Sequence, residues 1–383
     1  MELDTEQRNK LICRNLKEIC GGDILCKIVA NRPLNLYWGT APTGRIHLGY
    51  FVPMLKIADF LKAGCNVTIL FADLHAFLDN MKSDFAQLNY RTQYYENMIK
   101  EMLKVLNVDV NKLRFVRGTD FQLDKPYTMD VYRLNSLITV NTAKHAGAEV
   151  VKQTDNPLMT GLLYPTLQAL DEAHLGVDAQ FGGIDQRKIF MLARDTLPKL
   201  KSNPYNPNLK YNKRIHLMNE MIPGITTSKT ISVSDKKSVG NNEQCSEEQH
   251  DEEEAYIVNK MSSSNEKTKI DLLDGNGSIR KKIRAAYCLP GDDEDNCLMV
   301  ILEKVLFRIM EHRGEPFIIS RKEEHGGDLT FNTIDEVREM YKRQELHPDD
   351  FKNGIILYIV NLLAPIKSAF DTKELKVLLS KSY

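Results

Sequence analysis

Up to Pro223, short runs of β-forming residues alternate with helical patterns, and this alternation restricts the fold more than any other feature. The run Asn35–Trp38 is apolar and ends at Gly39, a pattern that indicates a buried strand. Further runs of this kind are Val67–Ala72, Leu113–Val116 and Ile215–Met218. One intervening segment has an apolar face at helical spacing, made by Tyr95, Met98, Met102 and Val105. Such alternation predicts an α/β fold with a parallel sheet covered on both faces.

The segments before and after this alternating region have different residue patterns. Leu3–Val29 has the periodicity of an amphipathic helix. Lys229–Asn259 carries eight acidic and three basic side chains in 31 residues, which predicts a flexible acidic loop. From Ile270 onward helical spacing dominates, for example at Leu298, Leu302, Val305 and Ile309. We therefore expect a second, mainly α-helical domain.

Composition excludes several classes of protein. The chain has 383 residues, 42% of them hydrophobic, which is enough to bury proper cores. The longest apolar candidate, Asn353–Ile366, is too short to span a bilayer, so no membrane partner is expected. Seven cysteines without a Cys-x-x-Cys pair favour a reducing, cytoplasmic compartment and no dedicated metal site. The net charge of -1 restricts any nucleic-acid contact to a local basic patch.

The stretch Tyr37–Tyr50 combines a strand end, a Gly/Pro/Thr turn and a helix start. Ligands of open α/β sheets bind at such an edge. Gly39, Gly44 and Gly49 would let the backbone approach a nucleotide, and the helix start would favour its phosphates. His47 lies just inside that helix, where a histidine is more often structural than catalytic. Alone, this turn is a weak signal.

Lys260–Ser264 places one lysine before three hydroxyl side chains and is bounded by charged sequence. Lysine and hydroxyl donors can follow the charge that grows on a phosphate during transfer. A lysine followed by serines is, on its own, usually a solvated loop.

A polar stripe marks one predicted helix. Tyr164, Gln168 and Asp171 recur at helical spacing beside an apolar stripe of leucines at 163, 167 and 170. Polar groups beside a core face need partners. They line either a ligand pocket or a solvent-exposed edge, and spacing alone leaves both open.

The segment Phe181–Gln186 closes another predicted strand. Its two glycines would let the chain pass under a nucleotide, and Asp185 could accept hydrogen bonds from ribose hydroxyls. A glycine pair at a strand end is more often simply a turn.

Taken together, these motifs resemble a known family. Pro42–Tyr50 is similar to the nucleotide signature of class I aminoacyl-tRNA synthetases, and Lys260–Ser264 to their lysine-serine signature. From about Leu36 to the C-terminus, the acidic segment apart, the chain resembles tyrosyl-tRNA synthetases of the eukaryotic cytoplasmic and archaeal type. The resemblance implies an N-terminal helical extension over 1–35, a Rossmann-like catalytic domain over 36–222, a mobile lysine-serine loop over 223–264 with the insertion 229–259, and a helical anticodon-binding domain over 265–383.

The resemblance also implies the site residues. Tyr37 and Asp171 would meet the phenolic hydroxyl of tyrosine, and the α-amino end would lie near Tyr164, Gln168 and Gln186. His47 and Lys260 would stabilise the phosphates in the transition state. The residues implied for ATP are Gly39, Thr43, Gly44, His47, Gly49, Gly183, Asp185, Lys260, Met261 and Ser262.

The implied reaction activates L-tyrosine with ATP, which Mg²⁺ accompanies, and transfers it to tRNA(Tyr). A homodimer with its interface around Lys125–Gly161 is implied as well. At the anticodon end, His325 stands where relatives stack an aromatic residue on a base, and Asp350 follows a His-Pro turn. The helix with Arg280, Lys281, Lys282 and Arg284 either contacts tRNA phosphates or is a solvated face.

The chain departs from the family pattern in three places, one of which is the anticodon end with His325 and Asp350. The signature ends Gly49-Tyr50 without the second histidine of many class I members, and the segment Lys229–Asn259 interrupts the approach to Lys260. The rival within the fold is a tryptophanyl enzyme. The rival outside it is an inactive RNA-binding or signalling descendant.

Overall fold

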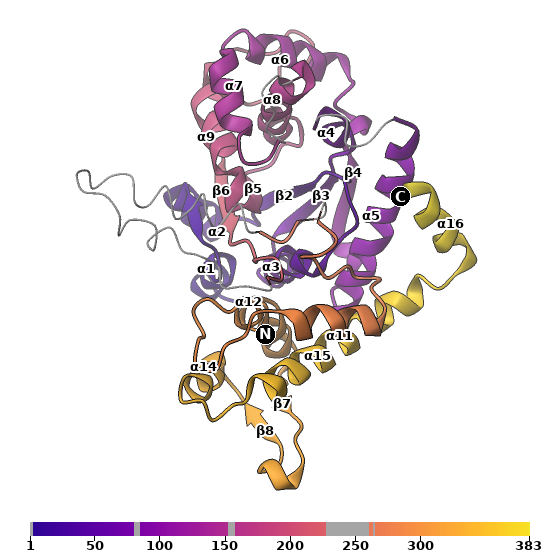
Figure 1. The fold of residues 1–383 in the computed structure, drawn as a ribbon. Helices are drawn as coiled ribbons and strands as arrows, with labels where there is room; N and C mark the ends of the chain where they lie inside the picture. The colour runs from indigo at the N-terminus through magenta and orange to yellow at the C-terminus, as the bar shows by residue number, and fades with distance from the viewer. Residues whose placement is uncertain (1–2, 80–84, 152–157, 227–259, 263–264) are drawn as a thin grey trace, which may run out of the picture. The chain divides into compact units, whose positions relative to one another are not determined.

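The computed structural model describes residues 3–79, 85–151, 158–226, 260–262 and 265–383. The chain forms two compact units, each described here by itself (Figure 1). The sheet unit contains Met1–Thr43, Lys56–Glu220 and Lys373–Tyr383. The helical unit contains Gly44–Leu55 and Met221–Thr372. The predicted acidic loop, Lys229–Asn259, lies outside the described residues.

A six-stranded sheet organises the sheet unit, in the order β1-β6-β5-β2-β3-β4. Its central strands β2, β3, β5 and β6 pair in parallel, as does β4 with β3, which confirms the predicted Rossmann-like α/β fold. All side chains of β5 and β6 are buried, as expected for strands covered on both faces. The strands are β2 (Asn35–Thr40), β3 (Asn66–Phe71), β4 (Leu113–Arg117), β5 (Ala179–Gly183) and β6 (Ile215–Asn219).

The N-terminal segment differs from the prediction of one helix over Leu3–Val29, which is wrong. It forms α1 (Thr5–Cys13), the short strand β1 (Glu18–Cys20) and α2 (Gly22–Asn31). Asn15 and Gly21 have left-handed backbone conformations, with φ of 60° and 89°, which end the helical path on both sides of β1. β1 then pairs antiparallel with β6 and closes one edge of the sheet.

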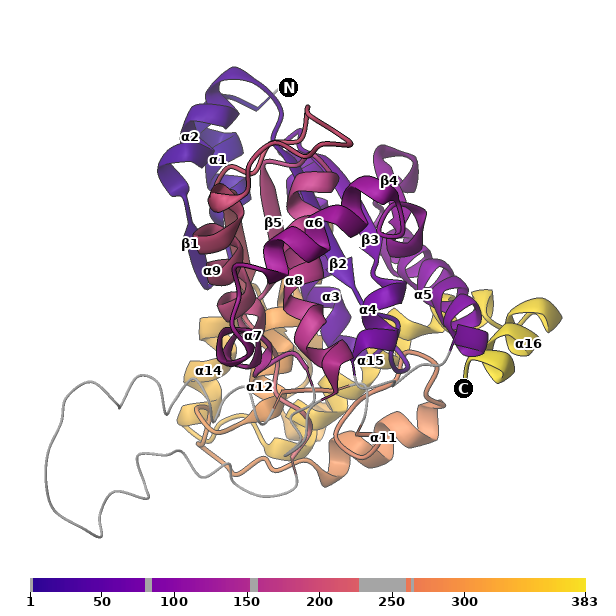
Figure 2. The ribbon, with the colours of Figure 1, turned by 90° about the horizontal axis from the view of Figure 1, so that it is seen from above.

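Helices of the sheet unit pack beside these strands (Figures 1 and 2). α5 carries the predicted apolar face, with Tyr95, Met98 and Met102 fully buried, and packs against the C-terminal α16. α4, α6, α8 and α9 share one buried apolar cluster, which fixes the helix that carries the polar stripe. The bounds are α3 (Phe51–Lys62, shared between the units), α4 (Asp73–Leu78), α5 (Phe85–Val105), α6 (Lys125–Asn135), α7 (Val140–Gly147), α8 (Met159–His174), α9 (Arg187–Thr196) and α16 (Lys373–Ser382).

The helical unit is mainly α-helical, as predicted. Leu298, Leu302, Val305 and Ile309 are all buried along one continuous helical stretch, although residues 302–307 adopt π-helical bonding. A two-stranded hairpin of β7 (Phe317–Ile319) and β8 (Leu329–Phe331) was not predicted. The helices are α11 (Asn276–Ala285), α12 (Cys297–Ile301), α13 (Arg308–Arg313), α14 (Ile334–Lys342) and α15 (Pro348–Ala369).

No single helix among the described residues is long and apolar enough to cross a membrane. By length and composition alone, the bent pair α15 and α16 meets that test jointly.

Candidate active site

Asp171 is the centre of a buried hydrogen-bonded cluster in the sheet unit. It lies on α8 and is 1% exposed. Its Oδ1 accepts a hydrogen bond from Gln122 Nε2 at 2.8 Å and another from Tyr127 Oη at 2.8 Å. Tyr127 also lies within hydrogen-bond distance of the Leu167 carbonyl, so the phenol from α6 joins the backbone and the carboxyl of α8. Two donors thus fix one oxygen of Asp171, and His75 Nε2 lies 3.9 Å from the other.

Burial raises the pKa of Asp171 to about 8, although the hydrogen bonds from Gln122 and Tyr127 oppose the shift. The charge of Glu172 adds to it. Around neutral pH this group is therefore largely a carboxylic acid. Such a group can both donate and accept a hydrogen bond, as recognition of a hydroxyl requires.

Tyr37 and Tyr164 stand beside this cluster. Tyr37, on β2, is 1% exposed, and its hydroxyl donates to the Gln168 carbonyl at 3.4 Å. Burial raises the pKa of Tyr37, and the charges of Asp171, Glu172 and Tyr164 raise it further. The Tyr164 ring meets the His75 ring edge-on, with centroids 4.7 Å apart. Burial lowers the pKa of His75 to about 3, so this imidazole is neutral.

Gln168 and Gln186 are joined directly: Gln168 Nε2 donates to Gln186 Oε1 at 2.8 Å. Gln186 belongs to the 3-10 turn Ile184–Gln186, which follows β5 and contains the buried Asp185. Gly182 leaves room for both neighbours, because a Cβ atom at that position would lie 2.6 Å from Gln186 Oε1 and 2.9 Å from the Phe190 ring. The predicted polar stripe of α8 therefore has partners and is not a solvent-exposed edge.

The first part of the nucleotide signature also belongs to the sheet unit. Gly39 lies within β2, and Thr43 follows β2 in a turn in which its amide donates to the Ala41 carbonyl at 2.9 Å. Arg91 of α5 donates to the Thr43 carbonyl at 3.0 Å. This guanidinium holds the backbone of the turn.

The second part of the signature, with Gly44, His47 and Gly49, belongs to the helical unit. Its backbone runs beside residues 270–272: Leu48 N donates to the Ile270 carbonyl at 2.9 Å, and Leu272 N to the Ile46 carbonyl at 3.3 Å. Arg45 and Asp271 tie the same two segments by an ion pair of 2.9 Å.

His47 is 7% exposed, and its Nδ1 accepts a hydrogen bond from the Gly49 amide at 3.2 Å. Burial, together with the positive charges of Lys269 and Lys260, lowers the pKa of His47 to about 3. Its imidazole is therefore neutral at physiological pH. Because Nδ1 accepts, this hydrogen bond assigns the proton to Nε2, which can donate to an anion.

The lysine-serine motif lies in the same unit as His47. Met261 N donates to the Ile222 carbonyl at 2.8 Å, and Lys260 forms an antiparallel bridge with Pro223. A Cβ at Gly49 would lie 3.2 Å from the Ile222 side chain, so the nucleotide signature packs on the residue whose carbonyl accepts from Met261. The structure thus joins two motifs that are about 210 positions apart in the sequence. Ser262 is described, whereas Ser263 and Ser264 lie outside the described residues.

Sequence reasoning missed four polar residues of the sheet-unit cluster. Asp73 and His75 follow β3 directly, and polar residues at the end of a buried strand were an unused signal. Asp73 accepts hydrogen bonds from the amide and the hydroxyl of Thr119 at 2.9 and 2.6 Å. Gln122 and Tyr127 gave no such signal, because only the tertiary fold brings them to Asp171.

The two residues predicted at the anticodon end lie in the helical unit. His325 ends a 3-10 turn before Gly326, its side chain is 64% exposed, and its Nε2 lies 3.6 Å from Glu324. Asp350 lies in the first turn of α15, which His347 caps.

The four basic side chains of helix α11 have two different environments. Lys282 Nζ donates to the Lys269 carbonyl at 2.7 Å and pairs with Asp274 at 2.8 Å. Arg280, Lys281 and Arg284 are exposed. Lys282 is thus used within the fold, whereas the other three face solvent.

Known proteins with similar sequences identify the family. A profile of the family described as tRNA synthetases class I (W and Y) matches residues 29–243 and 254–364. The chain belongs to this family. The cytoplasmic tyrosine–tRNA ligase of Saccharomyces cerevisiae is 44% identical over 388 residues, which cover 100% of this chain and 89% of that protein. This match places the chain on the tyrosyl-tRNA synthetase side of the family.

Two further similarities agree with a tyrosyl-tRNA synthetase. The cytoplasmic tyrosine–tRNA ligase of Danio rerio is 47% identical over the whole chain, which spans only 64% of that relative's length. The crystal structure of the Archaeoglobus fulgidus tyrosyl-tRNA synthetase, complexed with L-tyrosine, superposes with a TM-score of 0.77 at 29% identity. That alignment covers 96% of this chain and 99% of the archaeal one.

Proposed function

We propose that the chain is a tyrosine–tRNA ligase that activates L-tyrosine with ATP and transfers it to tRNA(Tyr). The observation that carries this proposal is the buried Asp171, with one oxygen fixed by Gln122 and Tyr127, beside the phenol of Tyr37. The relatives at 44% and 47% identity carry that activity in their names.

Selection of tyrosine over phenylalanine follows from the polar groups of Asp171 and Tyr37, which a substrate hydroxyl can meet. A substrate hydroxyl that meets Asp171 and Tyr37 restores hydrogen bonds in a site from which water is excluded. Phenylalanine would leave the second oxygen of Asp171 and the acceptor side of the Tyr37 hydroxyl without this partner, a discrimination already known for tyrosyl-tRNA synthetases. Tryptophan, the substrate of the rival reading within the fold, offers an indole N–H but no hydroxyl acceptor. We assign the α-amino end to Tyr164 and to the joined amides of Gln168 and Gln186.

Activation joins tyrosine to the α-phosphate of ATP. The tyrosine carboxylate attacks that phosphorus and pyrophosphate leaves. A terminal ribose hydroxyl of the tRNA then attacks the adenylate carbonyl, which forms the ester, expels AMP and releases the hydroxyl proton. ATP is the substrate, and Mg²⁺ accompanies its phosphates. We assign the nucleotide to Gly39, Thr43, Gly44, Gly49, Gly183, Asp185, Met261 and Ser262.

His47 and Lys260 act on developing negative charge and not as base or nucleophile. The neutral His47 donates through Nε2, since Nδ1 is already used by the Gly49 amide. Lys260 supplies a full positive charge from the same unit. Each interaction strengthens as charge grows on the phosphates.

We propose residues 36–222 as the catalytic domain, 265–383 as the anticodon-binding domain, and 1–35 as an N-terminal extension. The exposed His325 would stack on an anticodon base, and Asp350 would accept hydrogen bonds from base edges. The exposed arginines and lysine of α11 would contact tRNA phosphates.

A homodimer is part of the proposal, with its interface over Lys125–Gly161. Large apolar side chains are exposed there, with Tyr132 68%, Val140 57% and Met159 72% exposed. A second copy of the chain would cover them. In sedimentation velocity we expect a dimer that Tyr132→Glu weakens and Leu289→Glu, at an exposed position outside this range, does not. A monomeric wild-type protein would contradict this interface.

The names of the relatives support a cytoplasmic location.

Amino-acid-dependent exchange between pyrophosphate and ATP tests the activity. We expect exchange with L-tyrosine and not with L-tryptophan. Exchange with tryptophan alone would establish the rival enzyme, and no exchange with either would establish a binding protein without activity.

A further inference from the structure

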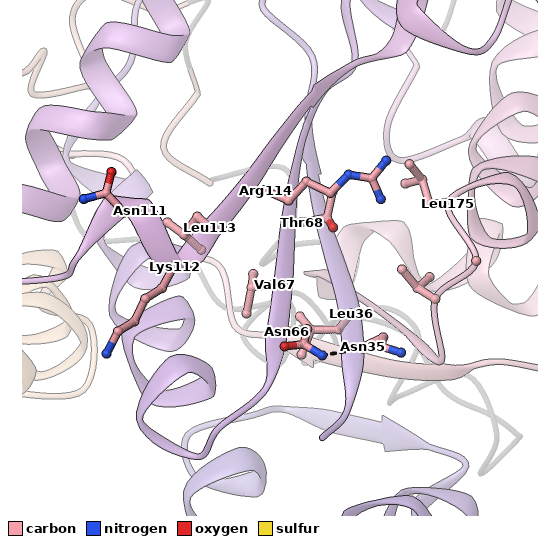
Figure 3. Close-up of a pocket in the computed structure, with 12 residues that line it drawn as sticks. Asn35, Leu36, Asn66, Val67, Thr68, Asn111, Lys112, Leu113, Arg114 and Leu175 are labelled. Carbon is pink, nitrogen blue, oxygen red and sulfur yellow. Dashed lines mark hydrogen bonds between the residues drawn. The ribbon is translucent and has the colours of Figure 1, made fainter. Parts of the chain in front are cut away.

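A hollow of about 470 Å³ lies at the amino ends of β2, β3 and β4, within the sheet unit (Figure 3). Its lining includes Asn35 and Asn66, the first residues of β2 and β3, and the loop that contains Leu175 and Val177. The nucleotide signature and Asp73 follow the carboxyl ends of the same strands. Within the sheet unit, the hollow is therefore at the opposite end of these strands from Thr43 and Asp73, and its size suits a small molecule.

Two charged residues, Lys112 and Arg114, line this hollow. The register partner of Arg114 on β3 is Thr68, which pairs in turn with Tyr37 on β2, so the three side chains stand on one face of the sheet. Figure 3 shows Arg114 extending over that face toward Leu175, with Thr68 beside it, whereas Lys112 points away. Within the described part of the chain, Arg114 has no hydrogen bond or ion pair.

Thr68 adds a second polar group. It is 8% exposed, it lines the hollow, and no described residue forms a hydrogen bond with its side chain. Thr68 Oγ1 is not among the fully buried unpartnered atoms of the described residues, so this hydroxyl is accessible and can donate a hydrogen bond to an acceptor in the hollow.

Two carboxylates close to the hollow in sequence, Asp178 and Asp109, form hydrogen bonds or ion pairs with other groups. Asp178 forms a two-fold ion pair with Arg32, at 2.6 and 2.7 Å, and also accepts from the Asn35 amide. Asp109 caps the turn Val110–Lys112 by accepting from the Asn111 amide. Neither of these two groups is paired with Arg114.

The remaining walls set the shape of the ligand. Leu175 and Val177 form an apolar wall that packs on the same buried cluster as Tyr37. Asn66 Nδ2 donates to Asn35 Oδ1 at 2.8 Å, which orients both amides at the mouth. An anionic head beside Arg114 and Thr68, with an apolar body against Leu175 and Val177, would satisfy both parts.

We propose that this hollow binds a small molecule that has a carboxylate or phosphate head and an apolar body. The site is independent of the proposed enzymatic activity, since none of its lining residues is assigned to tyrosine or ATP. A phosphate head and a carboxylate head share this chemistry, and the titration below distinguishes them.

Isothermal titration of the full chain, saturated with L-tyrosine, tests the site with cyclohexanecarboxylate, cyclohexyl phosphate, inorganic phosphate and neutral cyclohexanol. We expect one of the two cyclohexyl anions to bind most tightly, inorganic phosphate more weakly, and cyclohexanol not at all. Arg114→Gln should raise the dissociation constant at least about tenfold, since a hydrogen bond to a charged group is lost. Arg117→Gln is the matched control, because Arg117 lies on the same strand and pairs with Glu96.

Equal binding by the Arg114→Gln variant, equal binding of cyclohexanol, or no binding by the wild type would each overturn the proposal. A crystal of the wild-type protein soaked with the tighter anion gives a second test that needs no variant. Ligand density beside Arg114 and Thr68 would support the site. Density elsewhere alone, or none, would refute it.

Discussion

At the residue scale, the hydrogen bonds to Asp171 decide what its free oxygen can do. Tyr127 and Gln122 occupy Oδ1 from two different segments, so the carboxyl has one orientation. A substrate hydroxyl would meet a fixed group and would not have to order a mobile one. Fixing the partner beforehand lowers the entropic cost of binding.

Replacing Tyr127 by phenylalanine removes one of these two donors. We expect the KM for tyrosine in pyrophosphate exchange to rise on the order of tenfold, because a hydrogen bond to a charged or ionisable group is lost. Tyr205→Phe is the control, since Tyr205 is 45% exposed and lies outside both the Asp171 cluster and the proposed dimer interface. An unchanged KM in the Tyr127 variant would show that Asp171 is held in another way.

The raised pKa of Asp171 has a consequence for stability. Between the ordinary aspartate value of 3.8 and about 8, the folded protein keeps this proton and the unfolded chain releases it. The unfolded state then binds fewer protons, so the free energy of unfolding falls as pH rises through this range. Asp171→Asn cannot ionise, and its stability relative to the wild type should grow from about pH 4 to about pH 8.

Urea unfolding without ligand at a series of pH values measures this difference. Asp195→Asn, at an exposed carboxylate of α9, should show no such trend. A wild-type protein that gains stability over this range relative to Asp171→Asn would mean that the buried carboxyl is ionised.

At the scale of elements, hydrophobic periodicity predicted the strands and helix faces that depend on local sequence. The strands from β2 to β6 and the buried faces of α5 and α8 followed from spacing alone. The N-terminal helix was overextended, because two single residues with positive φ and pairing with β6 outweigh helical periodicity in Leu3–Val29. Gln122 and Tyr127 could not be predicted as partners of Asp171, since a contact across 44 or more positions leaves no local pattern.

The turn after β5 depends on Gly182. In Gly182→Ala the new methyl group would meet Gln186 Oε1 and the Phe190 ring, so at least one of these side chains must shift. A shift of Gln186 breaks its hydrogen bond with Gln168. We expect the KM for tyrosine to rise roughly tenfold through loss of that pairing. Gly277→Ala, in α11 with open space around it, should keep the KM and gain up to about 1 kcal/mol of stability. Steady-state exchange kinetics separate the two, and an unaffected Gly182 variant would contradict the assigned turn.

At the scale of the whole molecule, the signature motifs come from distant parts of the chain. His47 and Lys260 meet in the helical unit because residues 44–55 pack there, on segments that follow Met221. The sequence predicted both motifs but not this division, in which Tyr37 and Thr43 belong to the sheet unit.

Deletion of Lys229–Asn259 tests how far the acidic segment matters. Lengthening a surface connection costs little, about 0.6 kcal/mol for each doubling, so the shortened protein should keep its exchange rate within roughly threefold. The rate of tyrosine-dependent exchange, compared with the intact chain at equal concentration, measures this. A loss of activity would show that the segment is required, and a tag insertion at Gly314, an exposed loop position, controls for altered length.

Calorimetric titration of the protein with L-tyrosine, L-phenylalanine and L-tryptophan, without ATP, tests most directly whether Asp171 recognises the tyrosine hydroxyl. We expect tyrosine to bind at one site per chain, the other two amino acids to bind far more weakly, and Asp171→Ala to remove the preference for tyrosine. Indifference to tyrosine, or equal binding of phenylalanine, would mean that the carboxyl between Gln122 and Tyr127 does not recognise a hydroxyl.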